Sequence, residues 1–346
     1  MTKTHEWVNK LLIGLLLASG LAGCGAPAPV REVVIYTSVD QVFAEPELKR
    51  FESESGVQVK AVYDVEATKT TGLVNRLIAE KERPLADVFW SGEFIQTLLL
   101  QEKGVLQPYH SPNAETIPAI YKDPAGYWAG FAGRMRVLLV NTRLLSPEKY
   151  PQSAGDLLNP AYPAQQVGMA NPLFGTTLTH AAALYALWGP QKGRAFFQSL
   201  KERGIQVVDG NSVVRDMVVS GQLALGMLDS DDACGALEKK APAAIIIPDQ
   251  GGTGDIPGTL VIPNTVAVIA GAPHLAEARL LVDYLLRPQT EQDLAQSGWS
   301  HIPLHPGVQP TGCYPNGGVK DMGISLRDIY SQLEVVRKDL SELFMQ

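Results

Sequence analysis

Strand-like and helix-like patterns alternate along the chain from residue 32 onward. Runs of β-branched and apolar residues, typical of buried strands, occupy 33–38, 57–65 and 86–90. Stretches with the apolar spacing of amphipathic helices occupy 46–55, 70–83 and 92–104. This alternation predicts a mostly parallel sheet with helices on both faces, and such sheets bind ligands beyond the carboxyl ends of their strands.

A second set of alternating elements follows. Its strand-like runs lie at 135–142, 221–228 and 243–248, and a helix-like stretch occupies 174–189. A long β-rich segment at 258–271 is interrupted by Pro263 and Asn264. Two long strands, near 134–141 and 258–270, therefore lie between the two sets. We expect an α/β protein of two lobes, each a mixed, mostly parallel sheet flanked by helices, with these two strands crossing between the lobes as a hinge.

The first 23 residues have the layout of a secretory signal. Lys3 and Lys10 precede an apolar run that is shorter than the roughly 20 residues of a membrane span. The sequence Leu-Ala-Gly-Cys at 21–24 resembles the bacterial lipobox, which implies cleavage before Cys24 and a lipid on its sulfur. We expect a tether over 24–31 and an exported protein, in the periplasm or on the cell surface, held to the membrane by that lipid alone.

Composition excludes some classes of function. The chain has 346 residues, 45% of them hydrophobic, and a net charge of −7. An acidic chain without a block of Lys and Arg is a poor nucleic-acid binder. Cys234 and Cys313 lack the spacing of a structural zinc site. Export permits a disulfide between them, but the sequence does not show whether they are close enough to form one.

Several segments together resemble a known family. They are VVIYTSVDQ, PLADVFWSGE, GFAGRMRVLLVNT, NPLFGTT, DGNSVVRDMVVSGQLALGMLDSDDA and GTLVIPNTVAVIAGAPHLAEARLLVDYLL. The chain resembles the extracellular solute-binding proteins of ABC importers, in the branch that contains ferric-iron-binding periplasmic proteins. The resemblance covers residues 33 to about 310 and implies the two-lobed periplasmic-binding-protein fold of type II.

The resemblance also implies boundaries and partners. The N-terminal lobe would comprise 32–135 and 262–305, and the C-terminal lobe 136–261 and 306–346. A monomer would hold a small solute or metal ion in the cleft between the lobes and deliver it to a membrane permease with its ATPase subunits.

Three carboxylates follow a strand-like run on the predicted C-terminal lobe: Asp229, Asp231 and Asp232. In iron-binding members of the family, two adjacent tyrosines hold the cation at the positions matched here by Asp231 and Asp232. Unpaired buried charge costs several kcal/mol, so the cluster favours a ligand-binding loop. The alternative is that these residues cap the next helix. We expect at least one of Asp231 and Asp232 to face the ligand.

The N-terminal lobe offers Tyr36, Ser38, Asp40 and Glu93. Tyr36 and Ser38 end the first predicted strand and could line the cleft. Asp40 stands near a position where family members often carry a histidine, and it could supply an oxygen ligand or cap the following helix. Glu93 lies near the place of a family glutamate, although Gly92 offsets the spacing by one, and it could equally be a first-turn acid.

An anion site is predicted where Gly175, Thr176 and Thr177 open a helix, because a helix N-terminus exposes N–H groups and the positive end of its dipole. The alternative is that a threonine only caps the helix. Further contacts implied by the resemblance are Arg134, Asn211 and Ser212. His180 is expected to be packed, and His301 and His305 to lie in loops.

Two classes of ligand fit an acidic cluster combined with an anion site. One is a hard cation, with ferric iron ranked first by lineage, held by Asp40, Asp231 and Asp232 and completed by phosphate or carbonate. The other is a phosphonate- or phosphate-bearing amine such as 2-aminoethylphosphonate. The absence of both tyrosines weakens the case for iron.

A secreted hydrolase is the remote alternative. The sequence contains neither a GxSxG nor an HExxH motif, and no motif makes Cys234 a nucleophile. We therefore expect a binding protein and not an enzyme.

Overall fold

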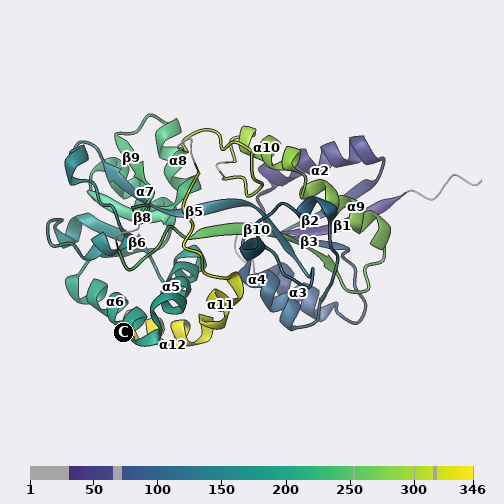
Figure 1. Cartoon of the computed structure of the whole chain (residues 1–346), viewed down its shortest axis with the longest axis horizontal. Helices are drawn as coiled ribbons and strands as arrows, with labels where there is room; N and C mark the ends of the chain where they lie inside the picture. Colours follow the sequence, from purple (N-terminus) through teal and green to yellow (C-terminus); the bar gives the residue numbers. More distant parts are fainter. Residues whose placement is uncertain (1–30, 65–71, 252–253, 300, 315–317, 346) are drawn as a thin grey trace, which may run out of the picture. The chain divides into compact units, whose positions relative to one another are not determined.

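The computed structural model describes residues 31–64, 72–251, 254–299, 301–314 and 318–345. Cys24 and the predicted signal and tether, except Arg31, lie outside the described residues. The compact unit comprises residues 32–346. Its strands form one sheet in the order β2-β1-β3-β10-β5-β8-β6-β7, with β4 beside β10 and β9 beside β5. Figure 1 shows helices packed along this sheet.

The first group of strands is parallel. It comprises β1 (Glu32–Thr37), β2 (Gln58–Tyr63) and β3 (Val88–Ser91), with the short β4 (Leu106–Gln107) nearby. Its helices are α2 (Gln41–Ser55), α3 (Gly72–Ala79) and α4 (Ile95–Glu102). Helix α2 ends at Gly56, whose φ of 67° suits a left-handed cap. These elements match the alternating pattern at the start of the chain.

The second group is built in the same way. It comprises β6 (Val167–Ala170), β7 (Gln206–Val208) and β8 (Leu225–Asp229), which are parallel, and β9 (Ala243–Ile246), which is antiparallel to β5. Its helices are α5 (Gly175–Trp188), α6 (Pro190–Arg203), α7 (Asn211–Ser220) and α8 (Ser230–Glu238). Short 3-10 helices lie in connecting segments along the described chain. Before β5 these are η3 (Pro112–Ala114) and η4 (Ala119–Tyr121), and after it η5 (Pro147–Lys149), η6 (Ala154–Leu158) and η7 (Ala164–Gln166).

Two long antiparallel strands join the groups. Strand β5 (Ala129–Asn141) pairs with β10 (Val261–Ile269) through its first half and with β8 and β9 through its second half. The predicted pair of crossing strands is therefore present, although β5 starts five residues before the expected 134. Every residue of β5 except Arg134 is buried. This arrangement agrees with the predicted α/β fold of two strand groups joined by crossing strands.

The β5–β10 pairing is irregular near Ala132 and the Pro263–Asn264 step. Ala132 has a φ of 47°, in the left-handed region that non-glycine residues avoid, and the β5–β10 register shifts between Pro263 and Asn264. The buried carboxylate of Glu291 accepts the Ala132 N–H at 2.7 Å, and the Asn264 side chain donates to the Ala132 carbonyl. These two hydrogen bonds satisfy the Ala132 N–H and carbonyl at the level where the sheet passes from one group to the other.

The C-terminal part returns to both groups. It forms α9 (Leu275–Leu285), α10 (Pro288–Gln296), α11 (Leu326–Ser331) and α12 (Leu333–Phe344). Pro288 separates α10 from α9 and opens α10, because proline fits the first turn of a helix but not its interior. No helix in the described part of the chain combines the length and apolar character needed to cross a bilayer.

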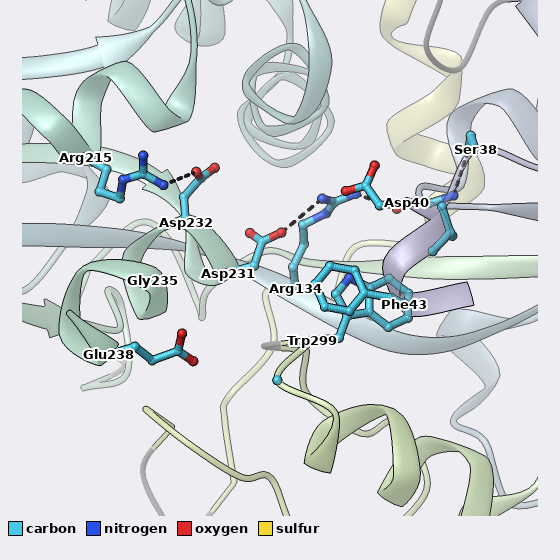
Figure 2. Close-up of a pocket in the computed structure, with 13 residues that line it drawn as sticks. Ser38, Asp40, Phe43, Arg134, Arg215, Asp231, Asp232, Gly235, Glu238 and Trp299 are labelled. Atoms are coloured by element: carbon cyan, nitrogen blue, oxygen red, sulfur yellow. Dashed lines mark hydrogen bonds and ion pairs between the residues drawn. The ribbon is translucent and has the colours of Figure 1, made fainter. Parts of the chain in front are cut away.

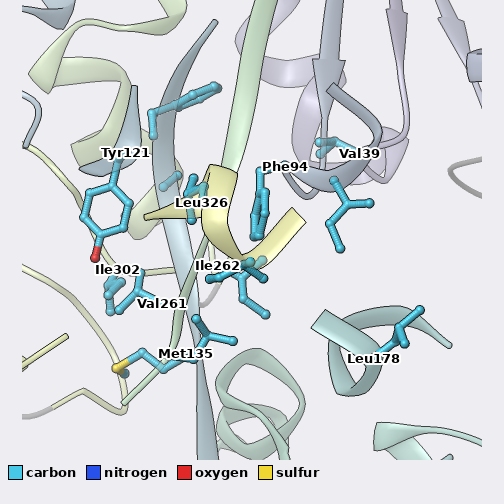
Figure 3. Packing of buried hydrophobic residues seen from close by; sticks show 14 of the residues in the cluster. Val39, Phe94, Tyr121, Met135, Leu178, Val261, Ile262, Ile302 and Leu326 are labelled. Atoms are coloured by element: carbon cyan, nitrogen blue, oxygen red, sulfur yellow. The ribbon is translucent and has the colours of Figure 1, made fainter. Parts of the chain in front are cut away.

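The hydrophobic core is continuous along the sheet. Figure 3 shows Met135, Val261 and Ile262, from the crossing strands, among the buried side chains that include Ile302 and Tyr121. Burial of an aliphatic side chain of this size contributes roughly 1.5–3 kcal/mol. The core thus fixes the crossing strands and the ends of the strands beside them.

A disulfide joins Cys234 to Cys313, with 5.6 Å between their Cα atoms and a sequence separation of 79. Cys234 lies on α8 and is fully buried. The Tyr314 hydroxyl, next to the second cysteine, donates to Ser230 Oγ at 3.0 Å. The returning chain therefore holds both the start and the middle of α8, which answers the question of pairing that the sequence left open.

We predict that replacing Cys234 and Cys313 together by alanine lowers the free energy of unfolding by about 2–5 kcal/mol, because a loop of this length is freed in the unfolded chain. Urea denaturation of the oxidised protein measures the difference. Reducing agent should lower the stability of the original protein and leave the variant unchanged. A loss well under about 1 kcal/mol would contradict a structural role for the bond.

Candidate functional site

A cavity of about 460 Å³ lies where the carboxyl ends of strands from both groups approach each other. Figure 2 shows its polar side chains directed toward a common space. The residues that line it are Ser38, Val39, Asp40, Phe43, Gly92, Arg134, Arg215, Asp231, Asp232, Gly235, Glu238, Gly298 and Trp299. Five sequence-predicted residues are brought together here: Ser38, Asp40, Arg134, Asp231 and Asp232. Its place agrees with the rule that ligands bind beyond strand ends.

Asp231 and Asp232 lie in the first turn of α8, immediately after β8. Asp231 Oδ2 is 3.4 Å from Arg134 Nη1, and Asp232 Oδ1 is 3.3 Å from Arg215 Nη1. Each of these four side chains is between 20% and 26% exposed. Both pairs are longer than a close charge-assisted hydrogen bond of about 2.8 Å. The cavity is therefore lined by two loose pairs of opposite charge.

Asp231 has one carboxylate oxygen that is not used. Its Oδ1 is buried and has no hydrogen-bond partner among the described residues. An unpaired buried acceptor is costly, and such groups call for a partner. A hydrogen-bond donor on a ligand would therefore supply the partner that Asp231 Oδ1 lacks.

Asp232 has an unusual affinity for its proton. Burial, together with the negative charges of Asp231 and Asp229, raises the pKa of Asp232 to about 7, while Arg215 opposes the shift. A carboxyl with this pKa is only partly ionised at neutral pH. A positive charge placed beside it would favour its ionised form.

Arg134 crosses the cavity floor from β5. Its Nη2 donates to the Gly92 carbonyl at 2.5 Å, and its Nη1 faces Asp231. Burial opposes the charged form, but the carboxylates of Asp231, Asp229 and Glu93 raise the pKa of Arg134 overall. Arg134 thus links the end of β3, in the first group, to α8 in the second.

The ends of β1 and β3 form the opposite wall. Ser38 Oγ accepts the Gly92 N–H at 3.0 Å, which ties the residue after β1 to the residue after β3. Asp40 occupies the N-cap position of α2, but its side chain makes no capping hydrogen bond. It also lines the cavity. The alternative expectation, that the Asp40 side chain caps α2, is therefore not met.

Several lining residues were not predicted from the sequence. Phe43 and Trp299 stack with 5.6 Å between ring centroids and an interplanar angle of 17°. Glu238 adds a fourth carboxylate and Arg215 a second guanidinium. Gly235 and Glu238 could have been found, because they follow Asp231 by four and seven residues and so share its helical face. No local pattern signals Trp299.

A second cluster of predicted residues surrounds a buried ion pair. Arg136, which is 0% exposed, contacts Asp229 with 2.6 Å between Nη1 and Oδ1. Thr176 donates to Asp229 at 2.6 Å, and Asn211 donates to it at 3.0 Å. Arg136 also donates to the hydroxyls of Thr176 and Thr177 and to the Asn211 amide oxygen, at 3.2–3.3 Å.

This cluster changes the interpretation of the predicted anion site. The two threonine hydroxyls bond to the Arg136–Asp229 pair and lie outside the cavity lining. A buried guanidinium needs such partners, since an uncompensated buried charge is strongly destabilising. Asp229 is likewise an internal partner of Arg136. We therefore do not include Asp229, Thr176, Thr177 or Asn211 among the ligand contacts proposed below.

Four other predicted residues also lie outside the lining. The Tyr36 hydroxyl donates to Glu80 at 3.1 Å, and Arg76 lies over its ring. The Glu93 carboxylate accepts the N–H groups of Ile95 and Gln96 at 3.3 Å, so it caps the start of α4 from a position before the helix and is not a first-turn acid. Gly175 and Ser212 are exposed at the starts of α5 and α7.

The tentative metal ligands do not form a prepared metal site. Among the described residues, no group of three or more His, Cys, Asp or Glu side chains is arranged to hold a metal ion. Asp231 and Asp232 instead each face an arginine. The arrangement can bind opposite charges at neighbouring points of one small cavity.

We predict that the side-chain carboxyl of Asp232 titrates near pH 7 in the ligand-free protein, in place of the usual value near about 4. Carboxyl-carbon NMR, assigned with an Asp232→Asn variant, measures the midpoint. Asp231→Asn should move the midpoint down, because it removes a neighbouring negative charge. Arg215→Gln should move it up. A midpoint near about 4 in the original protein would contradict this description of the cavity.

Comparison with known proteins places the chain among exported binding proteins. An iron uptake protein of Synechocystis is 23% identical over 302 residues, which is 83% of this chain and 81% of the relative. A periplasmic protein of Salmonella typhimurium that is named for 2-aminoethylphosphonate binding is 21% identical over 307 residues, 86% of each chain. A Trichodesmium protein solved with iron and citrate superimposes with a TM-score of 0.81 at 20% identity, covering 91% of this chain and 100% of that one.

The Trichodesmium protein shares the fold described above. The family model of the bacterial extracellular solute-binding protein matches residues 83–312, which include β3, both crossing strands and the whole of α8. The chain belongs to the family of bacterial extracellular solute-binding proteins.

Proposed function

We propose that the protein is the binding component of an ABC importer and captures a small solute that carries both a positive and a negative group. The observation that carries this proposal is the presence of two Arg–Asp pairs, Arg134–Asp231 and Arg215–Asp232, in one cavity between the two strand groups. The solute is delivered to a membrane permease, and Cys24 anchors the protein through a lipid.

A ligand with both charges can replace the existing partners of these side chains. Its ammonium group pairs with Asp231 or Asp232, and its phosphonate or phosphate pairs with Arg134 or Arg215. Every charge that loses a protein partner gains a ligand partner, so no charge is left buried and unpaired. The free Oδ1 of Asp231 accepts an additional hydrogen bond from the ammonium group.

A bare cation fits the cavity less well. To bind it, Asp231 and Asp232 would have to release Arg134 and Arg215, and both guanidinium groups would then repel the metal across a few ångströms. A cation that brings its own anion avoids this repulsion. Ferric iron with an organic or inorganic anion is therefore the second candidate, favoured by the four cavity carboxylates Asp40, Asp231, Asp232 and Glu238.

Closure of the cavity is the proposed means by which ligand binding is signalled. The ligand contacts side chains from both strand groups, so it favours the conformation in which those groups approach each other. Motion is absorbed where β5 and β10 cross between the groups, near Ala132 and the Pro263–Asn264 shift. The permease would distinguish the closed form from the open one.

We predict that Asp231→Asn together with Asp232→Asn weakens binding of 2-aminoethylphosphonate at least about 30-fold, since about 2 kcal/mol is lost when a buried charge loses its partner. Calorimetric titration at pH 8, where Asp232 is mostly ionised, measures the affinity. Ferric citrate is titrated in parallel to test the second candidate. The matched control is Asp255→Asn with Glu342→Gln, which removes two carboxylates outside the cavity.

The control variant should bind like the original protein. Affinity within about threefold of the original in the Asp231/Asp232 variant would exclude these residues as ligand contacts. Failure of the original protein to bind either compound would exclude both proposed ligands.

A further inference from the structure

We infer that Gly235 determines which ligands the cavity accepts, because the cationic end of the ligand packs directly against the bare backbone of α8 at this residue. The inference rests on the proposed function and names the contact that sets ligand size. The observations behind it are the backbone conformation of Gly235 and the space around this residue. They are independent of the two Arg–Asp pairs.

Gly235 lies within α8, where glycine is an unfavourable residue. Glycine loses the most backbone freedom on folding and is the poorest helix former except for proline. A glycine inside a helix therefore needs a reason, which is usually a backbone angle that other residues avoid or a neighbour that leaves no room for a side chain. The described residues around Gly235 provide neither.

The backbone of Gly235 is ordinary for a helix, and it is absent from the residues of positive φ. Apart from its two chain neighbours and the adjacent backbone of α8, a Cβ atom placed on it would meet no heavy atom of the described residues within 4 Å. Other glycines of the same fold differ. A Cβ on Gly193, in α6, would lie 2.3 Å from the Tyr185 ring, and one on Gly226, in β8, would lie 2.3 Å from Val214. Those two glycines are explained by packing, and Gly235 is not.

The open space beside Gly235 is the ligand cavity. Asp231, Gly235 and Glu238 follow each other by four and three residues, so they occupy one face of α8, and all three line the cavity. Figure 2 shows Gly235 on α8 between the carboxylates of Asp232 and Glu238. The opposite side of the helix is buried through Ala233 and Ala236. At this glycine, on the cavity-facing side of α8, no side chain of its own covers the main chain.

The carboxylates around this point define the chemistry of the group that packs there. Asp231 and Asp232 lie in the preceding turn and Glu238 in the following one, so the space over Gly235 is bordered by negative charge. A small ammonium group fits this position, and a side chain at residue 235 would occupy the same volume. Glycine at this position therefore lowers the stability of α8 but leaves space for the ligand at the binding surface.

The test replaces Gly235 by alanine and by leucine, which are both better helix formers. The urea midpoint of the ligand-free protein should rise in both variants. The affinity for 2-aminoethylphosphonate, titrated at pH 8, should fall at least tenfold with alanine and further with leucine. Opposite effects on stability and binding, ordered by side-chain size, are not expected of a glycine with a structural role.

Gly210→Ala is the matched control. Gly210 also has open space around it and an extended backbone, with φ −165° and ψ 170°, and it lies outside the cavity lining. Its replacement should leave the affinity for 2-aminoethylphosphonate unchanged. If the original protein binds only ferric citrate, the same series is measured with that compound.

Two results would overturn the inference while the proposed function stands. One is a lower urea midpoint in Gly235→Ala, which would show that the fold needs the glycine. The other is unchanged affinity in both Gly235 variants while Asp231→Asn with Asp232→Asn abolishes binding. If the original protein binds neither compound, both proposed ligands are excluded and the inference falls with them.

Discussion

The buried ion pair between Arg136 and Asp229 organises the part of the molecule that carries the cavity. The two residues face each other in the β5–β8 register, and both are almost fully buried. Hydroxyl and amide groups at the starts of α5 and α7 complete the polar network around them. One charge pair thus fixes two strands and two helix N-termini, and removal of either partner would leave a buried charge uncompensated.

This pair also explains why neighbouring charges remain available to a ligand. Asp229 pairs with Arg136, whereas Asp231 and Asp232, which follow it in the first turn of α8, line the cavity and face the looser partners Arg134 and Arg215. The disulfide and Tyr314 hold α8 from the other side. The binding groups of α8 therefore start from defined positions opposite the strand ends of the other group.

Much of the fold could be predicted from the sequence because its signals are local. Strand and helix periodicities identify β1, β2, β3 and the two crossing strands, and the resemblance supplies their arrangement. The carboxylates after β8 are likewise visible as a charged cluster where an apolar run ends. What periodicity does not contain is the pairing of distant residues, and the roles of side chains in this protein depend on that pairing.

Arg136 is the clearest example. It stands in an apolar run, and only its register with Asp229 shows that the threonines of α5 serve an internal ion pair. Trp299 reaches the cavity because the chain returns after α10 to stack on Phe43, a contact between residues far apart in sequence. The spacing of Gly235 from Asp231 indicates a shared helical face, but the open space beside Gly235 is visible only in the structure.

A crystal structure of the protein with 2-aminoethylphosphonate tests the central claim most directly. The account predicts the amine within roughly 3 Å of Asp231 or Asp232, over Gly235, and the phosphonate on Arg134 or Arg215. A ligand bound at the start of α5, with both Arg–Asp pairs of the cavity intact, would contradict it.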